Sequence, residues 1–188
     1  VKGLLLGEQA VHGLMTEQGE FKAERVVIAG GAWSALLLET TGVTLPVRPV
    51  RGQMILYRAE PDVVQRIVLS RDRYVIPRRD GRILVGSTLE EVGFDKSTTR
   101  AAMQELESEA ARLIPALANY PIEHHWAGLR PGSPHGIPYI MQHPRIEGLF
   151  INTGHFRNGV VLGLASARLL ADILLQRQPI LDPAPYAA

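Results

Sequence analysis

Three side chains of the 188-residue sequence stand where they could bind a small anionic substrate. Arg130 ends an apolar stretch, where its guanidinium could grip a carboxylate in a bidentate fork or form a structural pair with an acidic side chain. Arg157 lies at the junction of an apolar stretch with a helix start. Tyr74 alternates with Ile76, which places both on one face of a strand. A buried core position with a satisfied hydroxyl is the commoner explanation for a tyrosine in such a strand.

Two junctions in the sequence combine glycine with the start of a helix. The apolar run 25–29 continues into Gly30 and Gly31 and then into a helical composition over residues 32–39. The apolar run 149–153 continues into Gly154, before a long helix expected from about Asn158 to Gln176. Glycine lets the backbone approach a ligand closely, and a helix start offers free N–H groups to an anion or an electron-rich ring. The alternative is simple capping of the helix by Asn158, with a solvated Arg157.

The elements that would position these residues are short strands and two longer helices. Asp80-Gly81 is typical of a hairpin turn. Apolar residues at helical spacing predict a helix over residues 99–114, with Ser97, Thr98 or Thr99 as its cap. The last helix carries small residues four apart, at Gly159, Gly163, Ala167 and Ala171, which suit close packing against a sheet or a cofactor. The expected strands cover residues 3–6, 10–16, 25–29, 51–58, 66–70, 73–77, 82–87, 122–129, 137–141 and 149–153.

Composition excludes several classes of function. With 20 Lys and Arg against 19 Asp and Glu, the net charge is +1, which is too small a surplus for nucleic-acid binding. The absence of cysteine excludes disulfides, thiol catalysis and thiolate zinc sites. The six histidines show no metal-ligand spacing. The longest apolar stretch, residues 160–175, contains Arg168 and Asp172 and is shorter than the roughly 20 residues of a membrane span.

Five segments, taken together and in order, resemble the FAD-dependent D-amino acid oxidase superfamily, with the glycine oxidases of thiamine biosynthesis as the nearest group. The similarity covers nearly the whole chain. The segments are VVIAGGAWS at 26–34, RGQ at 51–53, YVIPR at 74–78 with GST at 86–88, WAGLRP at 126–131, and GHFRNG at 154–159.

The resemblance implies the oxidation of an amine, with a hydride passing from the substrate Cα to flavin N5, an imine product, and peroxide formed from oxygen. It implies that Arg130 binds the amino acid carboxylate, that Arg157 lies near it, and that Tyr74 lines the same pocket. The residues that it places against FAD are Gly30, Gly31, His155, Arg157, Asn158, Gly159, Val160 and Val161.

The expected fold is α/β, with a mixed, largely antiparallel sheet covered by helices. We expect residues 1–44 to belong to an FAD-binding domain, residues 45–130 to form a substrate-binding antiparallel sheet domain, and residues 131–188 to return to the FAD domain with the long helix. No G-x-G-x-x-G segment opens a βαβ unit. In the family that the sequence resembles, this unit precedes all five segments, so the resemblance implies that the chain is the C-terminal part of a longer enzyme, without the Rossmann core and the N-terminal FAD-binding portion.

We expect the parent to be a cytoplasmic oxidoreductase acting on CH–NH2 groups, and this chain alone to be inactive and without FAD. Assembly of identical chains stays open. Two alternatives remain: a sarcosine oxidase or D-amino acid dehydrogenase, and a non-catalytic domain that binds a small carboxylate or another protein.

Overall fold

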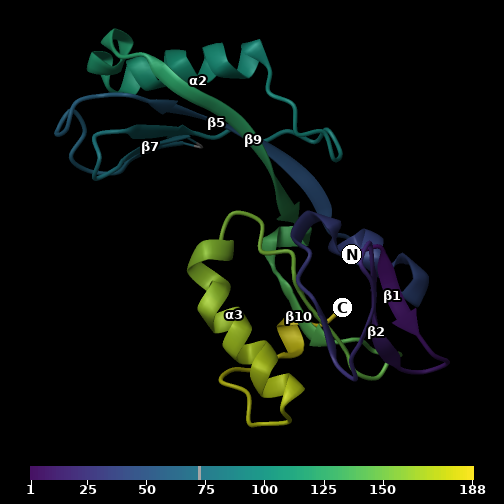
Figure 1. The fold of residues 1–188 in the computed structure, drawn as a ribbon. Coiled ribbons are helices and arrows are strands. Elements are labelled where there is room, and N and C mark those ends of the chain that lie inside the picture. The colour runs from purple at the N-terminus through teal and green to yellow at the C-terminus, as the bar shows by residue number, and fades with distance from the viewer. Residues whose placement is uncertain (72) are drawn as a thin grey trace. The chain divides into compact units, whose positions relative to one another are not determined.

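A computed structural model of the chain describes residues 1–71 and 73–188. The described residues form two compact units, the first made of Val1–Pro49 with Arg130–Ala188, and the second of Val50–Leu129. Each unit has its own sheet, helix and apolar core (Figure 1). The mixed α/β class expected from the sequence is confirmed.

The first unit contains two three-stranded sheets. One is an antiparallel meander of β1 (Gly3–Leu6), β2 (Val11–Thr16) and β3 (Gly19–Lys22). The other has the order β10-β11-β4, with β4 at Val26–Ile28, β10 at Tyr139–Gln142 and β11 at Leu149–Thr153. In this sheet β11 runs antiparallel to β10 and parallel to β4. In β11 the consecutive residues Leu149, Phe150 and Ile151 are all buried, as in a strand that packs on both faces, whereas in β4 Val27 is exposed.

Short helices and one long helix complete the first unit. Helix α1 (Ser34–Leu38) lies between two 3-10 turns, Gly31–Trp33 and Glu39–Thr41. Helix α3 (Gly159–Leu174) lies beside β10 (Figure 1). It packs on β10 and β11 through Leu169 and Leu170, which contact Ile140 and Phe150. Two further 3-10 turns cover Pro134–Gly136 and Ala184–Tyr186.

The small residues of α3, expected to pack against a sheet or a cofactor, are not the residues that pack on the sheet. The residues of α3 that are buried are Ser166, Leu169, Leu170 and Asp172, not the small residues at four-residue spacing. Large side chains fill the space against the sheet, so the small stripe does not make that contact. Asp172 is buried at 0% exposure and accepts hydrogen bonds from Nε of Arg168, one turn earlier, at 3.0 Å.

The second unit is a five-stranded sheet with one helix on it (Figure 1). The strand order is β6-β7-β8-β5-β9, and the paired neighbours β6–β7, β7–β8 and β8–β5 are antiparallel. Helix α2 (Arg100–Leu113) begins at Thr99, whose side chain accepts a hydrogen bond from the Ala102 N–H. It ends before the 3-10 turn Pro115–Asn119. The strands are β5 (Arg48–Tyr57), β6 (Val68–Ser70), β7 (Arg73–Pro77), β8 (Ile83–Gly86) and β9 (Ile122–Gly132).

One face of this sheet forms the core with α2. Ile55, Val75 and Val85 lie opposite one another on neighbouring strands and are fully buried, together with Leu106 of α2. Tyr57 belongs to the same core, and burial raises the pKa of its hydroxyl to about 12. Because side chains alternate along a strand, the neighbours of Val75 face the other side of the sheet.

Candidate functional site

The two glycine junctions of the sequence lie side by side at one edge of a sheet. Since β4 and β11 are parallel, Gly30 and Gly31 follow β4 at the same edge where Gly154 follows β11. The Thr153 hydroxyl joins the two junctions by donating a 3.0 Å hydrogen bond to the carbonyl oxygen of Gly31. The carboxyl edge of parallel strands is where open α/β sheets bind their ligands.

Backbone conformation explains why this edge needs glycine. Gly31 has φ +56° and Gly154 has φ +83°, values that residues with a side chain rarely adopt. A Cβ built at Gly31 would have no other atom within 4 Å, so the backbone there borders open space. The edge at Gly31 is therefore accessible to a ligand that approaches the main chain.

The end of β9 is bonded to the loop that follows β11. The Phe156 N–H donates a 2.9 Å hydrogen bond to the Pro131 carbonyl oxygen. Arg130 and Arg157 each adjoin one partner of this bond, so their backbones come close together. Arg130 is half-buried and Arg157 is exposed.

The start of α3 is open to solvent. Asn158 occupies the N-cap position, but its side chain makes no cap hydrogen bond. The first hydrogen bond of the helix runs from the Leu162 N–H to the Asn158 carbonyl at 2.9 Å. Val160 and Val161 are 99% and 85% exposed. Capping by the Asn158 side chain, the alternative that the sequence left open, does not occur, and the helix start can present N–H groups to a ligand.

His155 connects this loop to the body of α3. Its Nε2 lies 2.9 Å from the hydroxyl oxygen of Ser166, which is 4% exposed. Burial lowers the pKa of His155, so the ring is neutral near pH 7.

Tyr74 belongs to the second unit and lies on β7, on the face of the sheet opposite the α2 core. It pairs with Gly86 of β8, which in turn pairs with Met54 of β5. The Tyr74 hydroxyl lies 3.8 Å from the Met54 sulfur, a weak acceptor. A Cβ at Gly86 would come within 3.0 Å of the Tyr74 hydroxyl oxygen, so glycine makes room for the ring.

A buried polar network holds the segment between β8 and α2 in the second unit. Arg51 is 4% exposed, and its guanidinium donates to Glu90 and Asp95 at 2.6 Å each. Burial opposes the charged form of Glu90, but hydrogen bonds from Thr88 and Arg51 hold its pKa below the usual value, and hydrogen bonds from Ser97, together with Arg51, do the same for Asp95. Gln53 donates to Glu90 at 2.9 Å and accepts from the Thr99 N–H at 2.8 Å, which ties the network to the start of α2.

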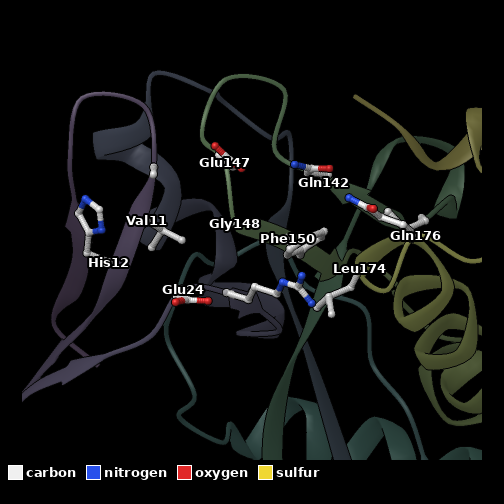
Figure 2. A pocket seen from close by; sticks show the side chains of 12 residues that line it. Val11, His12, Glu24, Gln142, Glu147, Gly148, Phe150, Leu174 and Gln176 are labelled. Atoms are coloured by element: carbon white, nitrogen blue, oxygen red, sulfur yellow. The ribbon is translucent and has the colours of Figure 1, made fainter.

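A cavity of 380 Å³ in the first unit lies at the other end of the parallel strands. Glu24 precedes β4 and Gly148 precedes β11, so both mark the amino ends of these strands. Figure 2 shows Gln142, Phe150 and Gln176 on one side of the cavity. The cavity is thus separate from the glycine edge, and it contains none of the residues that the sequence singled out.

The described residues include no group of three His, Asp or Glu side chains arranged to hold a metal ion. Among them, too, no helix combines the length and apolar character needed to cross a membrane.

The structure thus brings the predicted residues of the first unit together around one edge and places Tyr74 in the second unit. Sequence reasoning missed Thr153, Ser133 and Ser166, which hold the backbone of this edge. Ser133 donates a 2.7 Å hydrogen bond to the Gly154 carbonyl. The available signal was a hydroxyl residue beside or within an apolar run, as with Thr153 at the end of β11 and Ser166 inside α3.

Comparison with known proteins agrees with this architecture. Residues 1–173 match the DAO family, described as FAD dependent oxidoreductase. The chain is 55% identical over 187 residues to a glycine oxidase of Pseudomonas aeruginosa, covering 100% of this chain and 51% of that protein. It is 51% identical over 187 residues to a glycine oxidase of Pseudomonas putida, with the same two coverages.

A solved structure matches the fold closely. The crystal structure of glycine oxidase from Geobacillus kaustophilus superimposes with a TM-score of 0.88 at 35% identity, covering 92% of this chain and 47% of that one. The chain therefore spans about half the length of the curated relatives that it matches.

Proposed function

Because the chain belongs to the DAO family of FAD-dependent oxidoreductases, we propose that it is part of an enzyme that oxidises the amine of a small amino acid, with glycine as the substrate. The observation that carries the proposal is the glycine edge, where the ends of β4 and β11, the start of α3 and the end of β9 meet. This edge has the open backbone and the cationic side chains that a flavin and an amino acid carboxylate require.

The residues at this edge fit FAD. The backbone at Gly31 borders open space, and the start of α3 carries no side-chain cap, so both can receive polar parts of a large ligand. Gly30, Gly31, His155, Arg157, Asn158, Gly159, Val160 and Val161 would hold the cofactor. When bound, FAD supplies the two-electron acceptor for amine oxidation. The N–H groups at the start of α3 would stabilise negative charge beside them.

In this proposal three side chains bind the substrate. The Arg130 guanidinium binds the amino acid carboxylate in a bidentate fork, and Arg157 adds positive charge near it. Tyr74, in the second unit, is the third substrate residue of the proposal, since its hydroxyl has only the Met54 sulfur, a weak acceptor, as its partner among the described residues. Residues 45–130 act as the substrate-binding domain, and residues 1–44 and 131–188 as parts of the FAD-binding domain. The chain's own residues thus orient the substrate, and no general base is needed if the amine arrives neutral.

The test is a chimera in which this chain replaces the matching half of the Pseudomonas aeruginosa glycine oxidase. We expect the purified chimera to retain FAD, seen by its absorption spectrum, and to release peroxide when glycine is added. This chain alone, purified as the control, is expected to do neither.

Other outcomes separate the alternatives. A chimera that folds and binds no flavin would contradict the proposal. Flavin retention with oxidation of sarcosine or a D-amino acid in place of glycine, using oxygen or an artificial acceptor, would identify a related oxidoreductase. Binding of glycolate or glycine by this chain alone, without flavin, would favour a non-catalytic carboxylate-binding domain.

A further inference from the structure

The contact between His155 and Ser166 links the candidate cofactor loop to a buried position two turns inside α3. Nε2 of His155 and Oγ of Ser166 are 2.9 Å apart, although the residues are 11 positions apart in the sequence. Ser166 is 4% exposed and lies among the residues of α3 that are buried. Burying a hydroxyl is costly unless it is hydrogen-bonded, and alanine would suffice for packing alone. The hydroxyl is therefore placed for its contact with the ring.

The loop around His155 is held in an unfavourable conformation. Phe156 has φ +47°, in the left-handed region that a bulky residue seldom occupies. Such a conformation persists only where the surroundings hold it. The backbone is fixed by Ser133, which donates to the Gly154 carbonyl at 2.7 Å, and by Pro131, which accepts from the Phe156 N–H at 2.9 Å. The His155 ring adds an anchor to the helix.

The imidazole and the hydroxyl can stay hydrogen-bonded whichever ring nitrogen carries the proton. A neutral imidazole carries one N–H and one free lone pair, and a hydroxyl can accept from the first or donate to the second. The hydrogen bond can thus form with either tautomer of the ring. Burial disfavours the charged ring and therefore lowers the pKa of His155.

From this geometry we propose that Ser166 is a positioning residue of the cofactor site: by binding the His155 ring, it fixes residues 154–158 and hence the place of Arg157 and of the first N–H groups of α3. The proposal depends on the proposed function in one respect only, namely that the ligand held at this loop is FAD. The loop conformation itself can be measured without any cofactor.

The first experiment measures amide hydrogen exchange in this chain by NMR, in the wild type and in Ser166→Ala. We expect the Phe156 and Asn158 amides to exchange about tenfold faster in the variant, which corresponds to the loss of one ordinary hydrogen bond. The Ile151 amide, in the middle of β11, keeps its wild-type rate. Ser166→Thr retains the hydroxyl and is expected to restore slow exchange in the loop.

Ser34→Ala is the matched control, because Ser34 is another fully buried serine and its hydroxyl has no hydrogen-bond partner among the described residues. It should leave the Phe156 and Asn158 rates unchanged. Equal acceleration in Ser34→Ala, acceleration of all amides together in Ser166→Ala, or unchanged loop rates would each overturn the proposal.

A second variant keeps the proposal testable if Ser166→Ala fails to fold. His155→Leu removes the same contact from its half-buried end and should accelerate the same two amides. Where both variants fold, adding Ser166→Ala to His155→Leu should cause no further change, because the contact is already gone. Additive effects of the two substitutions would contradict a shared contact.

The chimera then tests the connection to the cofactor by FAD fluorescence titration. We expect Ser166→Ala to raise the dissociation constant for FAD about tenfold and Ser166→Thr to stay near the parent chimera. An unchanged dissociation constant beside a loosened loop would overturn the connection to FAD. If no form of the chimera binds FAD, the proposed function fails, whereas the exchange rates still decide the role of Ser166 in the loop.

Discussion

The hydroxyl of Thr153 donates a 3.0 Å hydrogen bond to the carbonyl oxygen of Gly31, and so joins two loops that are 122 residues apart in the sequence. Thr153 is 1% exposed, whereas Gly31 is half-buried. The bond fixes the spacing between the ends of β4 and β11. Its loss would therefore affect both the stability of the sheet and the shape of the candidate cofactor edge.

Thr153→Val keeps the branched shape and removes the donor. We expect the free energy of unfolding to fall by about 1 kcal/mol, the usual net contribution of one hydrogen bond, because the acceptor residue Gly31 is only half-buried. Urea denaturation followed by circular dichroism measures this change. Thr153→Ser keeps the hydroxyl and should lose less, and equal losses for Val and Ser would show that the hydrogen bond contributes nothing.

Arg130→Ala tests the proposed carboxylate contact in the chimera. We expect the KM for glycine to rise roughly 30- to 100-fold, because a hydrogen-bonded charge pair contributes more than a neutral bond. Affinity for FAD should change little. Arg177→Ala, at an exposed position near the end of α3, is the control and should leave the KM as it was. A wild-type KM for Arg130→Ala would refute the assigned role.

Gly86→Ala tests the packing of Tyr74. The new methyl carbon would lie 3.0 Å from the Tyr74 hydroxyl oxygen and 3.1 Å from Cγ of Met54, which is tighter than most real contacts of a Cβ atom. We expect a loss of about 1 to 3 kcal/mol in the free energy of unfolding from this overpacking. Adding Met54→Ala should recover part of the loss by making room. If Gly86→Ala is as stable as the wild type, the three side chains are not packed in this way.

Arg51→Met tests the buried network of the second unit. Glu90 loses its cationic partner, and we expect the free energy of unfolding to fall by about 2 kcal/mol, since both carboxylates keep some access to water. Arg58→Met is the control, because Arg58 pairs with Glu123 from a side chain that is 71% exposed, and it should have a much smaller effect. If the two variants have the same denaturation midpoint, the buried ion pairs of Arg51 contribute no more to stability than the exposed pair of Arg58.

Local sequence patterns predicted the elements that bury an apolar face. The strands at residues 3–6, 73–77 and 149–153 have the predicted bounds, and Thr99, one of the three cap candidates, caps α2. The strand β3 was missed because all four of its residues are exposed, so no buried face appears in the sequence, and backbone pairing with β2 holds it.

The candidate site was predictable only in part, for a physical reason. The glycines and arginines at the junctions can be recognised in the sequence because they stand directly beside an apolar run or a helix start. The contacts of Thr153 and Ser166 depend on which strands pair in parallel and on the path of the loop before α3. A hydroxyl inside an apolar run signals a buried hydrogen bond, but it does not name the partner.

The last prediction concerns His143, which is 3% exposed in the first unit. Its Nδ1 accepts hydrogen bonds from the N–H groups of Arg145 and Ile146 at 3.1 and 3.0 Å. Burial and the nearby Arg145 lower the pKa of His143. The unfolded chain takes up a proton near the ordinary value of about 6.5, whereas the folded chain stays neutral until a lower pH. Stability is therefore highest above about pH 6.5 and falls as the pH drops below it.

The variant His143→Asn tests this dependence, because Oδ1 of asparagine can accept in place of Nδ1 and cannot be protonated. We expect urea denaturation to give nearly wild-type stability at pH 7 and a shallower loss between pH 6.5 and pH 5. The part of the slope that remains is attributed to His125 and His155, whose pKa values burial also lowers. Identical pH slopes for the variant and the wild type would show that His143 does not control this loss.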